Sequence, residues 1–222
     1  MLIHLRRAFA ATLSLAVLAT LTSLDLTGDA RAQDAKAKNV TAALAAKAVE
    51  LPDMALGPAK APVTIVEYAS MGCPHCAAFE ENAFPMLRSK YIDPGKVRFV
   101  FREFPLDIKA TAASMLARCI ADGDAEKYFA AIRQLFKAQD QLMTQTTETL
   151  EEIGKQSGMD AQAVDACVKD QALLDKISAD KKFAFETLKV EVTPTFFING
   201  EMVKGAMSFE ELDETLKPLI KR

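Results

Sequence analysis

Histidine is scarce in this sequence, and concentrated positive charge is absent. The 222 residues include two histidines, and the 27 lysines and arginines are scattered among 30 acidic residues. No basic run alternates with aromatic side chains, as nucleic-acid-binding surfaces usually require, so the sequence predicts no nucleic-acid partner. Half of the residues are hydrophobic, which is enough for one globular core.

Long hydrophobic runs are also missing, apart from one near the N-terminus. Arg6 and Arg7 precede an apolar stretch from Ala8 to Leu24, and the small residues of Ala30-Arg31-Ala32 follow. This order is typical of a secretory signal peptide, which we expect at residues 1–32 with cleavage near Ala32. An uncleaved membrane anchor is the less favoured alternative, because the run is shorter than the ~20 residues that a span needs.

Predicted export determines how the cysteines are interpreted. All four of them follow the predicted signal peptide, at Cys73, Cys76, Cys119 and Cys167. Cysteines in an oxidising compartment tend to form disulfides, so both a catalytic and a structural pair are possible.

The remaining chain divides into four segments by composition and periodicity. Residues 33–60 are rich in Ala, Lys and Pro and predict a flexible lead-in. Residues 61–106 predict strand, helix and strand, and residues 107–189 carry only helical patterns. Residues 190–222 predict a strand hairpin with an Asn-Gly turn, followed by a helix. The fold class is therefore α/β, with a sheet core and an all-helical insertion.

The first cysteine pair lies in the motif CPHC, where a strand meets a helix. The stretch APVTIVEYAS at residues 61–70 predicts a buried strand, and Pro74 suits the first position of the helix that follows. Three kinds of site have this cysteine spacing: a zinc site, a static disulfide and a redox pair.

Zinc is poorly supported because a structural site needs four nitrogen or sulfur ligands. His75 is the one histidine beyond the predicted signal peptide, and the other two cysteines belong to the helical segment. A static Cys73–Cys76 disulfide would close a very small loop, which limits its stabilising effect.

A redox pair explains more of the motif. A thiol at a helix N-terminus faces unpaired N–H groups and the positive end of the helix dipole, which favour the thiolate. A protonated His75 would add positive charge. We therefore expect Cys73 to be the exposed, attacking sulfur and Cys76 the resolving one.

The motif order resembles the DsbA-like branch of the thioredoxin superfamily. Besides CPHC, the stretch VTPTFFING carries the resemblance, which extends from about residue 60 to 218. The resemblance implies a thioredoxin-like fold, with a mixed central sheet flanked by helices, and a periplasmic location. It also implies a cis peptide bond at Thr193-Pro194, beside the cysteine pair, with the Thr193 backbone turned toward substrate.

The resemblance assigns two further features. It places a buried acid at Glu67, beneath Cys76, where it can exchange a proton with that thiol; a solvated strand carboxylate is the alternative. Glu103 is similar, but we assign it no role. Cysteines in the insertion of related proteins pair with one another, so Cys119 and Cys167 are expected to form a structural disulfide. Two separate buried thiols are the alternative.

The predicted function is that of an exported thiol:disulfide oxidoreductase that introduces disulfides into secreted proteins. It uses no cofactor or metal beyond its redox-active disulfide, and a membrane quinone-linked partner of the DsbB kind would reoxidise it. Because residues 33–60 are too short for a dimerisation domain, we expect a monomer. The alternatives are an isomerase or reductase of the same superfamily and a periplasmic copper chaperone. Met71-Gly72 and Thr193 leave the substrate preference open.

Overall fold

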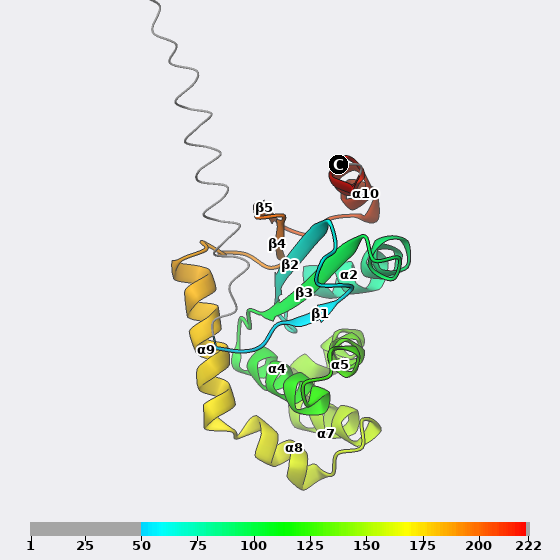
Figure 1. Cartoon of the computed structure of the whole chain (residues 1–222). Coiled ribbons are helices and arrows are strands. Elements are labelled where there is room, and N and C mark those ends of the chain that lie inside the picture. Colours follow the sequence, from blue (N-terminus) through cyan, green and yellow to red (C-terminus); the bar gives the residue numbers. More distant parts are fainter. Residues whose placement is uncertain (1–49, 221–222) are drawn as a thin grey trace, which may run out of the picture.

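The computed structural model describes residues 50–220, which form a mixed sheet flanked by helices (Figure 1). The sheet has five strands in the order β1-β3-β2-β4-β5. The strands are β1 Met54–Leu56, β2 Val63–Ala69, β3 Val97–Glu103, β4 Thr195–Ile198 and β5 Glu201–Lys204. Strands β2 and β3 are parallel and every other neighbouring pair is antiparallel, so the predicted fold class is confirmed.

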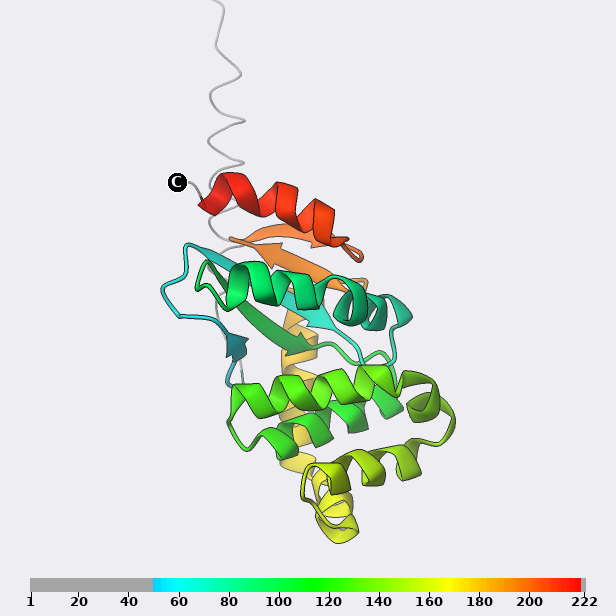
Figure 2. The ribbon, with the colours of Figure 1, turned by 90° about the vertical axis from the view of Figure 1, so that its right-hand side faces the viewer.

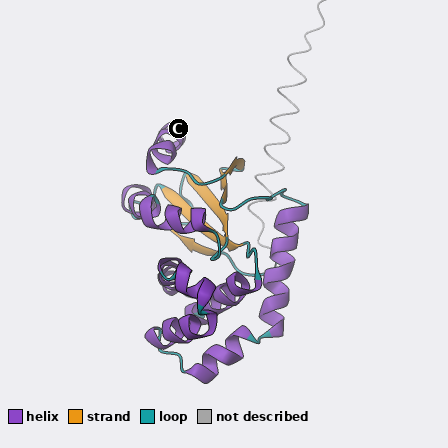
Figure 3. Ribbon diagram, turned by 180° about the vertical axis from the view of Figure 1, so that it is seen from behind, coloured by secondary structure: helices purple, strands orange, loops and turns teal. Residues whose placement is uncertain are grey.

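Helices cover both faces of this sheet (Figures 2 and 3). One face carries α2 Pro74–Asn82, α3 Phe84–Leu87, the π-helix η1 Arg88–Ile92 and α10 Phe209–Ile220. The long helix α9 Gln171–Glu186 lies across the other face. Because β2 and β3 are covered on both sides, their residues are buried almost continuously instead of alternately.

The helical insertion between β3 and β4 begins with α4 Ile108–Ala121 and α5 Ala125–Lys137. It continues through α6 Gln139–Thr144, α7 Thr146–Gln156 and α8 Ala161–Val168 to α9. Four of its helices start at an aspartate whose carboxylate accepts a hydrogen bond from the backbone N–H three residues later. These N-caps are Asp107, Asp124, Asp160 and Asp170.

An aromatic cluster joins the insertion to the sheet. The ring centroid of Phe84 lies 5.0 Å from that of Phe99 on β3 and 5.9 Å from that of Phe129 on α5. Phe79 of α2 stacks on Phe99 at 6.4 Å. All four rings are almost completely buried, so α2, β3 and α5 share one core.

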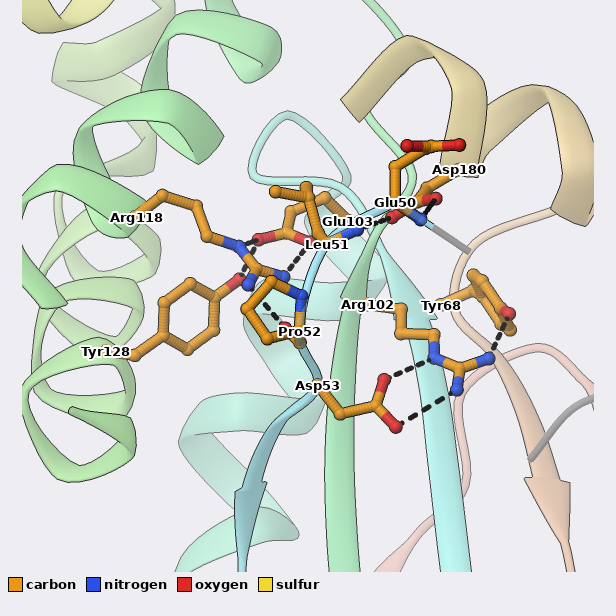
Figure 4. Close-up of polar contacts among 10 residues, drawn as sticks. All are labelled: Glu50, Leu51, Pro52, Asp53, Tyr68, Arg102, Glu103, Arg118, Tyr128 and Asp180. Atoms are coloured by element: carbon orange, nitrogen blue, oxygen red, sulfur yellow. Dashed lines mark hydrogen bonds and ion pairs between the residues drawn. The ribbon is translucent and has the colours of Figure 1, made fainter. Parts of the chain in front are cut away.

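The segment before β1 is fixed by polar contacts (Figure 4). The Asp180 carboxylate of α9 accepts hydrogen bonds from the backbone N–H groups of Glu50 and Leu51, at 2.8 and 3.1 Å. Asp53 forms a two-bond ion pair with Arg102 of β3, at 2.9 and 3.1 Å. The expected flexible lead-in at residues 33–60 is thus wrong from residue 50 onward, because this part includes β1 and is anchored to β3 and α9.

Two of the predictions concern the N-terminal 49 residues, which lie outside the described part of the chain. These are the signal peptide at residues 1–32 and the rest of the lead-in at residues 33–49. Among residues 50–220, no helix combines the length and hydrophobicity that a membrane crossing requires.

A disulfide between Cys119 and Cys167 joins α4 to α8, with an S–S distance of 2.03 Å. The expected second pair is therefore confirmed, and the alternative of two separate thiols is wrong. The bridge is packed with Leu51, Met115 and Ile177 in a small hydrophobic cluster. It therefore connects two helices of the insertion at the point where the N-terminal segment covers them.

Removal of this disulfide is expected to destabilise the protein strongly. The bridge spans 48 residues, and in the chain-entropy model a loop of this length contributes about 4 kcal/mol. The double variant C119A/C167A should lower the free energy of unfolding in urea by about that amount. Both proteins are compared in a C73A/C76A background, so that the redox state of the other pair does not contribute. An unchanged free energy would contradict the prediction.

Candidate active site

The CPHC motif lies at the end of β2, where the chain turns into α2. Cys73 is the N-cap residue of α2 and has an extended backbone conformation, with φ −91° and ψ 118°. Pro74 occupies the first helical turn, as predicted. The Cys73 carbonyl accepts the first hydrogen bonds of the helix, from the N–H groups of Cys76 at 3.1 Å and Ala77 at 3.2 Å. The Cys73 sulfur thus lies at the helix N-terminus.

Cys73 is less accessible than we expected. Only 5% of the residue is exposed, so the predicted exposure of Cys73 is wrong, whereas its role as the attacking sulfur stays a prediction. The reason is a second segment, distant in sequence, that covers the sulfur: the Cys73 thiol donates a hydrogen bond to the Thr193 carbonyl oxygen at 3.3 Å. Pro74 and His75 are exposed, whereas Cys76 is fully buried. Both cysteines are free thiols, so this geometry is that of the dithiol form.

The covering segment contains the expected cis peptide bond, between Thr193 and Pro194. Neighbouring hydrogen bonds hold it in place: Thr195 Oγ1 donates to the Val192 carbonyl at 2.7 Å, and the Gly205 N–H donates to the Pro194 carbonyl at 2.9 Å. Thr193 and Pro194 are both buried. The expected pairing of the Thr193 backbone with a substrate strand stays a prediction.

The two thiols have opposite pKa shifts. The pKa of Cys73 is lowered to about 5, chiefly because the Cys76 thiol hydrogen-bonds to its sulfur. The Thr193 side chain and the backbone N–H groups of Cys76 and His75 lower the pKa further, against the opposing effect of burial. Burial strongly raises the pKa of Cys76, and the nearby charges of Glu67 and Cys73 add to this. Cys73 is therefore the thiolate of the pair at neutral pH.

Glu67 lies beneath this pair on β2. The residue is 2% exposed, so the alternative of a solvated strand carboxylate is wrong. Burial raises its pKa well above the ordinary value, and the negative charges of Glu80 and Cys73 raise it further. A buried acid whose charge also affects the Cys76 pKa can hold and return a proton beside that thiol.

A second buried acid, Glu80, was missed in the sequence. Its side chain is 6% exposed, and its Oε1 has no hydrogen-bond partner among the described residues. Arg133 of α5 approaches this oxygen to 3.6 Å. Burial raises the Glu80 pKa to about 7, although Arg133 opposes the shift. The available signal was its position four residues after Cys76, which puts both side chains on one face of α2.

Glu103, by contrast, is fully paired. Arg118 binds both of its carboxylate oxygens, with Nη2–Oε2 at 2.7 Å, and the Tyr128 hydroxyl donates to Oε1 at 2.5 Å (Figure 4). Arg118 also donates to the Pro52 carbonyl at 2.7 Å. A buried carboxylate with this many partners holds β3, α4 and α5 together, which is a structural role.

Two grooves flank α2. One has a volume of about 350 Å³, lies between α2 and α10, and has an apolar lining that includes Phe79, Met86, Met207 and Phe209. The other has a volume of about 820 Å³ and separates the α2–η1 segment from α5 and α6. Glu80, Arg133 and Gln139 line this larger groove.

Metal binding has little support in the described part of the chain. Residues 50–220 contain no group of three or more Cys, His, Asp or Glu side chains that could hold an ion together. A copper site on the two thiols alone would not need such a group and stays untested.

The structure combines a thioredoxin-like sheet, a helical insertion and a cysteine pair beside a cis-proline. This combination defines a class of redox proteins. Residues 50–218 match the family described as thioredoxin. The solved structure of Wolbachia pipientis alpha-DsbA1 is 32% identical, with a TM-score of 0.70, and the match covers 77% of this chain and 92% of that one. The chain therefore belongs to the DsbA-like branch of the thioredoxin family.

One further relative supports this placement, and a second solved structure shares the fold. A Rickettsia bellii protein, provisionally named protein-disulfide oxidoreductase, is 35% identical over 150 residues, which are 67% of this chain and 57% of that protein. The chain thus spans a little over half the length of this relative. Oxidised BdbD from Bacillus subtilis has the same fold, with a TM-score of 0.68 at 21% identity, over 77% of this chain and 94% of that one.

The thiolate of Cys73 should be visible in a pH titration of the reduced protein. Ultraviolet thiolate absorbance should rise with a midpoint near pH 5. The C76S variant should keep an acidic midpoint, because a serine hydroxyl can also donate to the Cys73 sulfur. The C73S variant should lose this transition, since burial keeps Cys76 protonated. A wild-type midpoint at the ordinary value for a cysteine would contradict the assignment.

Glu80 should make the stability of the protein pH-dependent. Its folded-state pKa of about 7 exceeds the ordinary 4.5, so the folded state holds the proton more tightly and stability falls as pH rises between these values. The E80Q variant should remove this loss, which is about 3 kcal/mol for a shift of this size. Urea unfolding at both ends of the pH range, in the C73A/C76A background, measures the difference.

The neighbouring exposed Glu81 provides the matched control. The E81Q variant should keep the wild-type pH dependence, because the Glu81 side chain is exposed and the buried Glu80 carboxyl is left intact. Equal pH dependence of wild type and E80Q would contradict the buried-acid assignment.

Proposed function

We propose that this protein is an exported thiol:disulfide oxidoreductase that introduces disulfides into secreted proteins. The observation that carries the proposal is the stabilised Cys73 thiolate at the N-terminus of α2. A pKa about two units below neutral pH stabilises the dithiol form by about 3 kcal/mol at pH 7, relative to a pair whose thiol stays protonated. The disulfide form is then a stronger oxidant, because its reduction becomes more favourable.

The reaction proceeds in two exchange steps. A substrate thiolate attacks the Cys73 sulfur, the Cys73–Cys76 bond breaks, and Cys76 leaves and takes up a proton. Glu67, buried beside Cys76, is the proposed donor of that proton. A second substrate thiolate then attacks the substrate sulfur of the mixed disulfide and releases Cys73 as a thiolate. The substrate has lost two electrons and the protein has gained them.

The surface around the site suits an unfolded, apolar substrate. Leu106, Ile108 and Val192 are large hydrophobic residues with exposures of 52%, 74% and 44%. They lie in segments that follow β3 or precede β4, at the same end of the sheet as the cysteine pair. Exposed Met86 lines the apolar groove between α2 and α10. Reduced proteins expose apolar residues before they fold, so these surfaces can bind them without a defined sequence.

The remaining parts of the proposal concern location and partners. We propose a periplasmic monomer whose cysteine pair is its redox centre, without a cofactor or metal. Reoxidation requires a disulfide-bearing partner, and a membrane quinone-linked protein of the DsbB kind fits this need. The relatives' names support disulfide chemistry, whereas the partner and the monomeric state rest on the sequence alone.

The proposal is tested by equilibrating the protein with glutathione and by offering it a reduced, unfolded protein with two cysteines. The equilibrium should favour the reduced form of this protein, and the substrate should gain a disulfide. The C76S variant should form a mixed disulfide that accumulates, because the resolving thiol is missing, whereas C73S should not react. An equilibrium that favours the oxidised protein would overturn the direction of electron flow.

The alternatives are separated by two additional measurements. An isomerase in its dithiol form would restore activity to a protein with mispaired disulfides faster than the oxidised form creates new ones. A copper chaperone would bind copper(I) tightly in the wild type and lose this binding in C73S. Tight copper binding without exchange activity would favour the chaperone.

A further inference from the structure

Gln139, the first residue of α6, reaches from the helical insertion to the backbone of the active-site turn. Its Nε2 donates hydrogen bonds to the Met71 carbonyl oxygen at 2.7 Å and to the Cys73 carbonyl oxygen at 3.1 Å. These two carbonyls flank Gly72, directly before α2. One side-chain amide thus contacts the turn at the residue that carries the thiolate.

The turn is otherwise held from the opposite side. Ser70 Oγ accepts hydrogen bonds from the N–H groups of Gly72 and Leu106, each at 3.2 Å. A Cβ on Gly72 would lie 2.8 Å from an Asp107 carboxylate oxygen at the start of α4. The turn is therefore enclosed between α4 and α6, and Gln139 supplies the hydrogen bonds from the α6 side.

We propose that Gln139 is a positioning residue for the redox reaction. It keeps the first turn of α2 in the orientation that stabilises the Cys73 thiolate. This inference rests on the proposed function, because it concerns the same thiolate.

The electrostatic reason follows from the two carbonyl groups. Carbonyl oxygens carry partial negative charge, which is unfavourable near a sulfur anion. An amide N–H directed at both oxygens offsets this charge. It also fixes the peptide plane of Cys73, whose carbonyl accepts the first helical hydrogen bonds from Cys76 and Ala77. Without Gln139, the N–H groups that face the sulfur would be less well ordered, and the thiolate would be less stable.

Gln139 also lines the larger groove beside α2, together with Glu80 and Arg133. One residue of this groove thus also contacts the active-site backbone. The insertion can thus influence the thiolate through α6, without contact with a substrate.

The test uses substitutions that change the donor and leave the cysteines intact. The Q139A variant removes both hydrogen bonds, and Q139E replaces the donor with an acceptor that repels the two carbonyls. The midpoint of the Cys73 thiolate titration should rise by about half to one pH unit in Q139A and by more in Q139E. The equilibrium constant with glutathione should move about threefold to tenfold toward the oxidised protein.

Two controls separate positioning from stability. Gln141 is exposed on the same helix, so Q141A should leave the titration and the redox equilibrium unchanged. The Q139K variant keeps a donor at this position, and its thiolate midpoint should stay low. Urea unfolding of each variant reports global stability separately.

The outcomes are distinguishable from failure of the proposed function. A wild-type thiolate with an ordinary pKa would overturn that function itself. A low wild-type pKa that is unchanged in Q139A would overturn the positioning role alone, even if Q139A is less stable. An equal rise in Q141A would also overturn it, because the effect would then belong to α6 as a whole.

Discussion

The interaction on which this structure depends is the stabilisation of a sulfur anion at the N-terminus of α2. Two parts of the chain that are distant in sequence meet at this sulfur: the β2–α2 turn with the first turn of α2, and the loop that contains Thr193, whose side chain helps to lower the Cys73 pKa. The Cys73 thiol meets the Thr193 carbonyl at 3.3 Å, across 120 residues of sequence. The parallel pairing of β2 with β3 and the antiparallel pairing of β2 with β4 put these segments at one end of the sheet.

Buried carboxylates in this protein belong to two kinds of environment. Glu103 has an arginine and a tyrosine as direct partners, and its burial joins three elements of the fold. Glu67 on β2 and Glu80 on the active-site helix α2 have raised pKa values, and burial is the main cause in both. Such acids lower the stability of the folded protein at neutral pH. Both acids are near the active-site cysteine pair, where the thiol of Cys76 must gain and lose a proton. This chemistry gives a reason for the loss of stability.

The helical insertion does more than cover the sheet. Its disulfide joins α4 to α8, and the polar contacts of Arg118 and Asp180 fix the insertion to β3 and to the segment before β1. The aromatic cluster around Phe84 joins it to α3 and, through Phe79, to α2. A rigidly attached insertion can hold Gln139 against the active-site turn, which a mobile one could not do.

The sequence by itself determined the order of elements and the cysteine pair at a strand–helix junction, whereas the position of the cis-proline was implied by the resemblance to the DsbA-like branch. The first two depend on short-range physics: hydrophobic periodicity, the restricted φ of Pro74 and N-capping by residues such as Asp160. Only the tertiary structure decided that Cys73 is covered, that Met54–Leu56 form a strand, and that Glu80 and Gln139 belong to the site. A three-residue strand has no periodicity of its own and forms because β3 offers a free edge. Burial of a thiol or an acid likewise depends on which distant segment lies against it.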